Sequence, residues 1–97
     1  MRVVQSSDGE WYHLEDGAAQ YLVLYLDQSP GVGIIFMIQL SGIESAACDY
    51  HGRKYLQDFA NKIAWSPEAF KDRRVDPETQ ARAQDAIEAN EQAASNR

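Results

Sequence analysis

The sequence predicts an α+β fold: a four-stranded antiparallel β-meander followed by C-terminal helices packed on one face of the sheet. Turn signals divide residues 1–41 into short segments rich in β-forming residues. From residue 42 onward, apolar residues recur at helical spacing instead. A chain of 97 residues is long enough for one domain with its own core. We divide it into a sheet (1–41), a helical cover (42–74) and an acidic, alanine-rich terminal helix (75–97).

Two Asp-Gly pairs, Asp8-Gly9 and Asp16-Gly17, predict tight hairpin turns, because Asp and Gly tolerate the positive φ that type I′ turns need. A third, longer turn is expected between Asp27 and Gly33, where polar residues, proline and glycine gather. The predicted strands are 2–6, 10–15, 19–26 and 34–40.

The hairpin turns also predict which residues face each other across neighbouring strands. The expected pairs are Val4–His13, Trp11–Leu22, Tyr12–Tyr21, Leu26–Ile34, Leu24–Phe36 and Leu22–Ile38. Side chains then alternate between two faces of the sheet. The aliphatic face, which we interpret as core, holds Val4, Trp11, His13, Leu22, Leu24, Leu26, Phe36, Ile38 and Leu40. The tyrosine face, whose mixed composition is typical of interfaces, holds Val3, Gln5, Tyr12, Leu14, Tyr21, Val23, Tyr25, Ile35, Met37 and Gln39.

Two apolar stripes predict helices after the sheet. Ser41 and Glu44 fit a capping box at the start of the first helix. At about 100° per residue, the two stripes would lie on roughly opposite sides of one continuous helix. Gly52 stands between them, so we predict two helices, 42–50 and 53–65, with Gly52 ending the first. The stripes are Ile43, Ala46, Ala47 and Tyr50, and then Leu56, Phe59, Ala60 and Ile63.

Two further helices are predicted by a cap residue followed by proline. Ser66-Pro67 opens a short helix that reaches about Arg74. Asp76-Pro77 opens a final helix from 77 to about 93. Its apolar residues are alanines and the single large Ile87, so this last helix has little to bury.

The tyrosine face is expected to lack sufficient cover from the chain itself. Four strands about 4.8 Å apart and about eight residues long make a face of roughly 19 by 26 Å. Helices are about 10 Å across, so about two of them cover one such face. We expect helices 42–50 and 53–65, with Trp65 and Phe70, to cover the aliphatic face. Either the alanine-rich helix then packs thinly on the tyrosine face, or a partner covers it.

Charge is unevenly distributed along the chain, whose formal net charge is −6. Residues 1–49 carry a charge of −6, residues 50–75 carry +3 and residues 76–97 carry −3. Net acidity disfavours direct binding to nucleic acid, because neutralisation of phosphates drives such binding. The span 21–40 approaches transmembrane length, but polar residues, a proline and glycines interrupt it, so we expect a hairpin and no membrane span.

The single cysteine, Cys48, excludes an internal disulfide framework, and no N-terminal apolar signal segment is evident, so we expect a cytoplasmic protein. Cys48, Asp49, His51 and His13 are candidates for a thiol or metal cluster. No second Cys or His pair supplies the three or four ligands that zinc needs. We therefore expect no catalytic residue, metal ion or cofactor, and keep an enzyme or metal site at Cys48 and His51 as a minor alternative. His13 is expected to be a hydrogen-bonded structural residue beside Gln20.

The acids of the last helix fall largely along one of its sides. The simplest interpretation is a solvated helical face. A sharper one is an array of carboxylates that imitates a phosphate backbone and occupies a nucleic-acid-binding groove of a partner. In this respect the chain is similar in type to small acidic phage inhibitors of host defence enzymes, although it carries no family motif. The acids are Asp76, Glu78, Asp85, Glu88 and Glu91.

These observations predict a small, acidic, non-enzymatic protein-binding module. It would act as an inhibitor or as an accessory subunit of a larger complex. The alternative is a homodimeric structural protein joined through its sheet face. The predicted partner-binding residues are Tyr12, Tyr21, Tyr25, Met37, Asp85, Glu88 and Glu91.

Overall fold

The computed structural model describes residues 1–7, 10–29 and 32–95, and its elements follow the predicted order. The strands are β1 (Arg2–Ser7), β2 (Trp11–Asp16), β3 (Ala19–Ser29) and β4 (Val32–Gln39). The helices are α1 (Gly42–His51), α2 (Arg53–Trp65), the 3₁₀ helix η1 (Pro67–Arg73) and α3 (Pro77–Ser95). The sheet order is β1-β2-β3-β4 with antiparallel neighbours, so the predicted α+β meander is confirmed.

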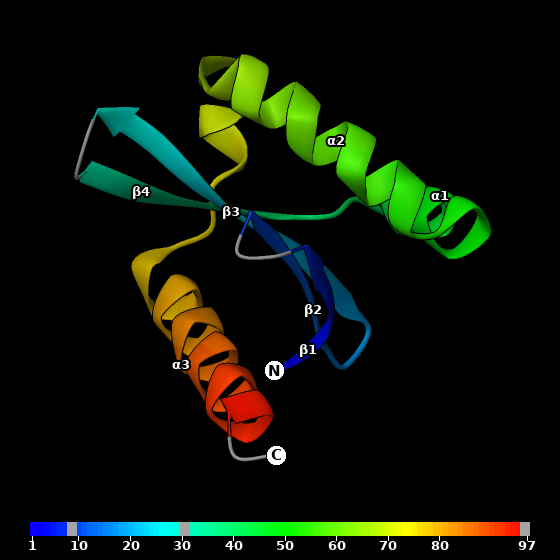
Figure 1. The fold of residues 1–97 in the computed structure, drawn as a ribbon. Helices are drawn as coiled ribbons and strands as arrows, with labels where there is room; N and C mark the ends of the chain where they lie inside the picture. Colours follow the sequence, from blue (N-terminus) through cyan, green and yellow to red (C-terminus); the bar gives the residue numbers. More distant parts are fainter. Residues whose placement is uncertain (8–9, 30–31, 96–97) are drawn as a thin grey trace.

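The elements form three layers (Figure 1). Helices α1 and α2 follow one another along one side of the sheet, and α3 lies against the opposite side. The short segment between η1 and α3 passes along the outer edge of β4, where Ile38 forms a bridge with Arg74. Val75 N donates to Met37 O at 3.0 Å, and Arg74 Nη2 donates to Ile35 O at 3.1 Å. This segment covers part of an edge that would otherwise offer unpaired backbone groups.

The register of the sheet agrees with the prediction in one hairpin and differs in another. Between β3 and β4 the predicted pairs are confirmed, including Leu24 opposite Phe36. Between β2 and β3 the pairing is shifted by two residues, so that Trp11 faces Leu24 instead of Leu22. The turn there consists of Gly17 and Ala18, and Gly17 has the positive φ of 62°. A shift by an even number keeps every side chain on its predicted face.

The first hairpin contains a β-bulge that the sequence did not reveal. Gln5, and not Val4, lies opposite His13, and the register changes between Val3 and Gln5. Val4 is the extra residue of this bulge and is 40% exposed, so its assignment to the aliphatic core is wrong. The predicted Asp8-Gly9 turn lies outside the described residues.

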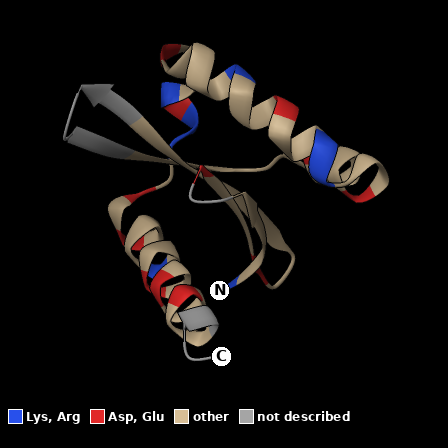
Figure 2. Cartoon of the chain, viewed as in Figure 1, with Lys and Arg blue, Asp and Glu red and all other residues tan. Residues whose placement is uncertain are grey.

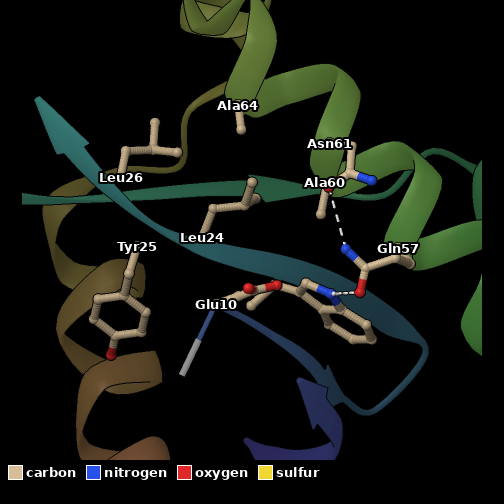
Figure 3. Close-up of a pocket in the computed structure, with 9 residues that line it drawn as sticks. Glu10, Leu24, Tyr25, Leu26, Gln57, Ala60, Asn61 and Ala64 are labelled. Atoms are coloured by element: carbon tan, nitrogen blue, oxygen red, sulfur yellow. Dashed lines mark hydrogen bonds between the residues drawn. The ribbon is translucent and has the colours of Figure 1, made fainter. Parts of the chain in front are cut away.

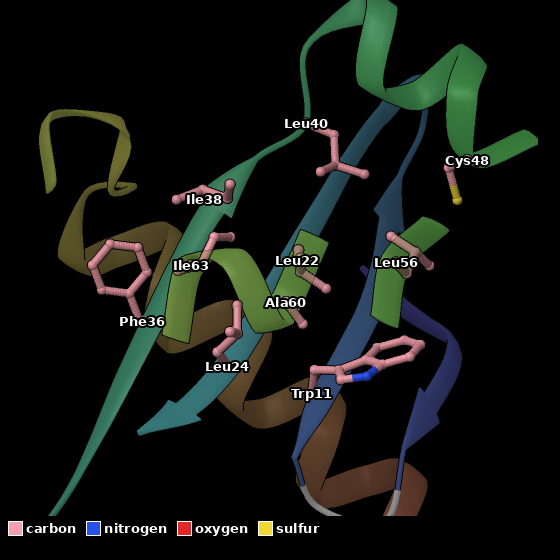
Figure 4. Close-up of a cluster of buried hydrophobic side chains, with 10 residues drawn as sticks. All are labelled: Trp11, Leu22, Leu24, Phe36, Ile38, Leu40, Cys48, Leu56, Ala60 and Ile63. Atoms are coloured by element: carbon pink, nitrogen blue, oxygen red, sulfur yellow. The ribbon is translucent and has the colours of Figure 1, made fainter. Parts of the chain in front are cut away.

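The aliphatic face forms the first core, under α2 (Figure 4). Side chains of β2, β3 and β4 meet Leu56, Ala60 and Ile63 of α2, as the stripe on 53–65 predicted. The cluster holds Trp11, Leu22, Leu24, Phe36, Ile38, Leu40, Cys48, Leu56, Ala60 and Ile63.

The predicted helix ends are largely confirmed. Ser41 and Glu44 form both hydrogen bonds of a capping box: Glu44 N donates to Ser41 Oγ at 3.1 Å, and Ser41 N donates to Glu44 Oε1 at 2.8 Å. Gly52 ends α1 with a φ of 71°. Asp76 accepts hydrogen bonds from the backbone N and the hydroxyl of Thr79 in the first turn of α3.

Candidate interaction surfaces

The tyrosine face is covered by the chain's own last helix. Ala83 and Ile87 of α3 are buried against it, and of the predicted binding residues Tyr12 is 5% exposed and Met37 0%. The expectation that this face lacks cover is therefore wrong, and the thin packing of α3 is the alternative that holds. The cluster holds Tyr12, Leu14, Val23, Met37, Ala83 and Ile87, with Met1, Val3, Tyr21, Tyr25, Ile35, Val75 and Ala86 half-buried around it.

The side chain of Tyr12 projects from strand β2 toward helix α3. Its hydroxyl donates to Glu91 Oε1 at 2.5 Å, and its ring packs edge-on against Tyr25 at a centroid distance of 5.7 Å. Burial raises the pKa of Tyr12 well above its ordinary value, and the neighbouring Glu91 carboxylate raises it further. Tyr12 therefore connects the sheet to α3, the helix that covers it.

The acids of α3 do not form one unbroken array (Figure 2). Asp85 and Glu88 are exposed, whereas Glu91 accepts the Tyr12 hydrogen bond and Asp76 caps the helix. Arg82 lies among them and pairs with Asp16 of β2 at 2.7 Å. Binding of a partner by Asp85 and Glu88 stays a prediction.

Helix α1 turns its apolar stripe toward solvent. Ile43 and Tyr50 are each 85% exposed, and Ala46 is exposed between them. They are seven residues apart, which places them on the same side of the helix two turns apart. Cys48, the buried residue of α1, lies on roughly the opposite side. The expectation that this stripe helps to cover the aliphatic face is therefore wrong.

A series of aromatic rings leads from this exposed side of α1 to the core-facing side of α2. Tyr50 packs edge-on against His51 at 4.8 Å between ring centroids, and His51 stacks on Tyr55 at 6.5 Å. Tyr55 then contacts Phe59 at 5.9 Å. Tyr55 and Phe59 are half-buried against the first core, so the series runs from the core to the surface. We call the set Ile43, Tyr50, His51, Tyr55 and Phe59 the helical stripe.

Two aromatic residues predicted to help cover the aliphatic face have different positions. Phe70 is half-buried and packs against the first core, as predicted. Trp65 is 89% exposed at the end of α2, so its predicted role in the core is wrong. Two residues earlier, Ile63 takes the buried position at this end of the helix.

The residues considered for thiol or metal chemistry lie in different environments. Cys48 is buried, and burial raises the pKa of its thiol, while His51 is exposed between Tyr50 and Tyr55. His13 is buried on the sheet, with Nε2 2.8 Å from Gln20 Oε1 and Nδ1 3.2 Å from Gln5 Nε2. This agrees with the structural role predicted for His13. Among residues 1–7, 10–29 and 32–95, no three His, Cys, Asp or Glu side chains are placed to hold a metal ion.

A hollow of about 220 Å³ lies between the sheet and α2 (Figure 3). Leu24, Ala60 and Ala64 line its apolar part. At the rim, Gln57 Oε1 accepts from Trp11 Nε1 at 3.0 Å, and Gln57 Nε2 donates to Asn61 Oδ1 at 3.2 Å. Small-molecule sites usually enclose about 300–1,000 Å³. The hollow is thus smaller than a usual cofactor site and of a size that suits one side chain of a partner.

Comparisons with known proteins give no relative: no family model matches the chain, and no curated protein or solved structure shows significant similarity. Within the described part of the chain, no helix combines the length and apolar character needed to cross a membrane.

The sequence prediction missed Ile43 and Tyr50 as surface residues. The signal was present, because two apolar stripes on opposite sides of a nearly continuous helix cannot both face the sheet. The prediction instead relied on Gly52 to turn both stripes inward.

Proposed function

We propose that this chain is a small, non-enzymatic protein-binding module that docks on another protein through the helical stripe. The observation that carries the proposal is the 85% exposure of both Ile43 and Tyr50 on the same side of α1. Single exposed apolar residues are normal on protein surfaces. Within α1, Ile43, Ala46, Ala47 and Tyr50 have the i, i+3, i+4, i+7 spacing by which amphipathic helices bind. The rings of His51, Tyr55 and Phe59 extend this surface from Tyr50.

The chemistry of the helical stripe supports this proposal. Tyrosine and other aromatic residues are enriched at protein interfaces, where they contribute large contact areas with little loss of conformational entropy. Tyr55 and Phe59 are anchored on the first core, which holds that part of the stripe in a fixed position. A fixed aromatic surface loses less entropy on binding than a flexible one.

The surroundings of the reactive groups agree with a binding role. The Cys48 thiol is buried and its pKa is raised, whereas a nucleophilic cysteine needs access and a lowered pKa. The lone thiol also fits the cytoplasmic setting that we propose for the protein.

As for its role, we propose an accessory subunit or an inhibitor. The helical stripe and the outer side of α3 belong to opposite layers of the molecule (Figure 1). A partner bound to the stripe would leave Asp85 and Glu88 exposed. Mimicry of a nucleic acid would use those two carboxylates, a shorter array than the sequence suggested.

Site-specific photo-crosslinking tests the proposal. A benzophenone amino acid is placed at Tyr50 and, as a matched control, at the exposed Ala89 of α3 in the full chain. We expect a crosslinked product with a second protein from position 50 in cells, none from position 89, and loss of the product when Ile43→Glu is added. A folded chain that gives no product from position 50 would contradict the proposal.

The second candidate is a homodimer, now through the helical stripe, since α3 covers the sheet face. The order Ile43, Ala46, Ala47, Tyr50 reads large-small-small-large from either end, so two antiparallel copies of α1 would place Ile43 against Tyr50. Crosslinking of the purified chain separates the candidates. A product containing two copies from position 50 favours self-association, and a product seen only in cells favours another protein.

A further inference from the structure

We infer that α3 is a reversible lid on the tyrosine face, which leaves the sheet as a unit while the rest of the molecule stays folded. The inference concerns the opposite layer from the helical stripe and does not depend on docking there. It rests on how the two cores are divided and on how little α3 contributes to its own.

The two buried clusters have no residue in common. The first is closed by α2 with Leu56, Ala60 and Ile63, and contains no residue of α3. The second is covered mainly by α3, with Ala83 and Ile87 as its buried side chains, and Val75 of the preceding segment packs at its edge. Departure of α3 would therefore open the second cluster and leave the contacts of the first in place. Proteins open in such cooperative parts when a part has its own set of contacts.

The sheet contributes more buried apolar side chains to the second cluster than α3 does. The sheet contributes Tyr12, Leu14 and Met37, whereas α3 contributes one alanine methyl and the side chain of Ile87 as its fully buried groups. In addition, the side-chain oxygen Gln84 Oε1 is buried without a hydrogen-bond partner. A buried acceptor without a partner favours the open state, where water can reach it.

Three polar contacts of the described residues join the lid to the sheet, and one of them links Gln84, in the middle of the helix, to the Tyr25 side chain. Arg82 and Asp16 form a surface pair with side chains 52% and 33% exposed, and such pairs contribute little to stability. The Tyr12–Glu91 hydrogen bond lies near the other end of the helix. Ahead of the lid, Arg74 and Val75 remain bonded to β4, which places the hinge at Asp76 and Pro77.

Helix α3 keeps a high helix propensity after it leaves, although it frays without the sheet. It is rich in Ala, Glu and Gln, which have high helix propensity. Its N-terminal hydrogen bonds from Thr79 to Asp76 are local and do not involve the sheet. The open state would expose Tyr12, Tyr21, Tyr25 and Met37, a surface whose composition is typical of protein interfaces.

Native-state hydrogen exchange of the full chain tests the lid without any variant. A free helix of this length frays in water, so its amides exchange once it has left the sheet. We expect the amides of residues 83–88 to exchange at least tenfold faster than those of residues 56–63. These amides should all give the same free energy of opening, and that free energy should depend only weakly on denaturant concentration. A gradient of exchange from the helix ends inward would indicate fraying in place and would overturn the inference.

The substitution Ile63→Val sharpens this test. It weakens the first core, which is intact in both the closed and the lid-open forms, so it changes global unfolding and leaves lid opening unaffected. We expect the amides of 56–63 to exchange about 2- to 10-fold faster and those of 83–88 to keep their wild-type rates. Equal acceleration in both helices would show that α3 leaves only when the whole chain unfolds, and the lid would be excluded.

Discussion

Tyr12 and Glu91, 79 residues apart in the sequence, meet where the tyrosine face contacts α3, with the Tyr12 hydroxyl 2.5 Å from Glu91 Oε1. This contact joins the second strand to the C-terminal part of the last helix. The chain thus uses its weakest amphipathic helix to cover one side of the sheet. Large apolar side chains stay exposed on the other side, at Ile43 and Tyr50 of α1.

The stability of the protein is expected to fall at alkaline pH because of Tyr12. Burial, reinforced by Glu91, raises its pKa above the ordinary 10.0, so the folded state favours the neutral phenol. This contribution is complete below pH 10 and is lost as the pH rises above the pKa of the unfolded chain. Urea unfolding between pH 8 and 11 should show a flatter alkaline decline in Tyr12→Phe, while Tyr50→Phe, an exposed ring, keeps the wild-type slope. Identical slopes in all three proteins would place the ionising group elsewhere.

Two isoleucines of opposite burial should respond differently to truncation. Ile87→Ala removes the large buried side chain of α3 and should lower the free energy of unfolding by about 2–4 kcal/mol. Ile43→Ala removes an exposed side chain and should change it by no more than about 0.5 kcal/mol. Chemical denaturation of both variants measures the difference. A cost at Ile43 equal to that at Ile87 would mean that α1 packs inward in solution.

The Glu44–Arg73 ion pair should contribute stability that is lost in acid. Burial raises the pKa of Glu44, but hydrogen bonds from Arg73 and Ser41 outweigh it and hold the pKa below the ordinary 4.5. The contribution is therefore present above about pH 4.5 and disappears as the pH falls through the lowered value.

Glu44→Gln isolates that ion pair, because glutamine can still complete the capping box. We expect a loss of about 1–3 kcal/mol at pH 7 and a flatter acid decline, measured by urea unfolding from pH 7 to 3. The control is Glu68→Gln, whose exposed partner Lys71 lies 3.6 Å away, and it should have little effect. A similar loss of stability in both variants would contradict the larger contribution expected of the Glu44–Arg73 pair.

Gly52 is expected to be required by its backbone conformation. Its φ of 71° is unfavourable for residues with a Cβ, although no atom outside its immediate chain neighbours lies within 4 Å of the position a Cβ would take. Gly52→Ala should therefore destabilise the protein by about 1–2 kcal/mol through backbone strain alone. Gly42→Ala, in the ordinary helical conformation of the first turn of α1, should instead stabilise by about 0.4–1 kcal/mol. Thermal unfolding of the two variants gives the comparison, and shifts of the same sign would contradict it.

Local patterns predicted the elements well because their causes are local. The capping box at Ser41 and Glu44 needs residues three apart, and the β3–β4 register follows from two long apolar runs around one turn. The two-residue slip between β2 and β3 escaped prediction because it leaves every side chain on the same face. The bulge at Val4 has no signature in the apolar pattern.

The direction in which an amphipathic helix faces depends on its neighbours and not on its own period. The stripe of Ile43 and Tyr50 predicts a helix correctly, yet α2 occupies the sheet and α1 is left with its stripe in solvent. The cover of the tyrosine face was misjudged for a related reason. Large side chains of the sheet fill that core, so α3 needs little more than Ile87 to close it.

Hydroxyl-radical footprinting of the side chains, on the purified chain and in cell extract, measures both the cover of the tyrosine face by α3 and docking through the helical stripe. In the purified protein at low concentration, Tyr50 and Trp65 should be oxidised readily, whereas Tyr12 and Met37, beneath α3, should be protected. In extract, Tyr50 should become protected while Trp65 serves as an internal reference. Oxidation of Tyr12 and Met37 as fast as Tyr50 in the purified chain would contradict the cover by α3. A Tyr50 equally reactive in both samples would contradict docking through the helical stripe.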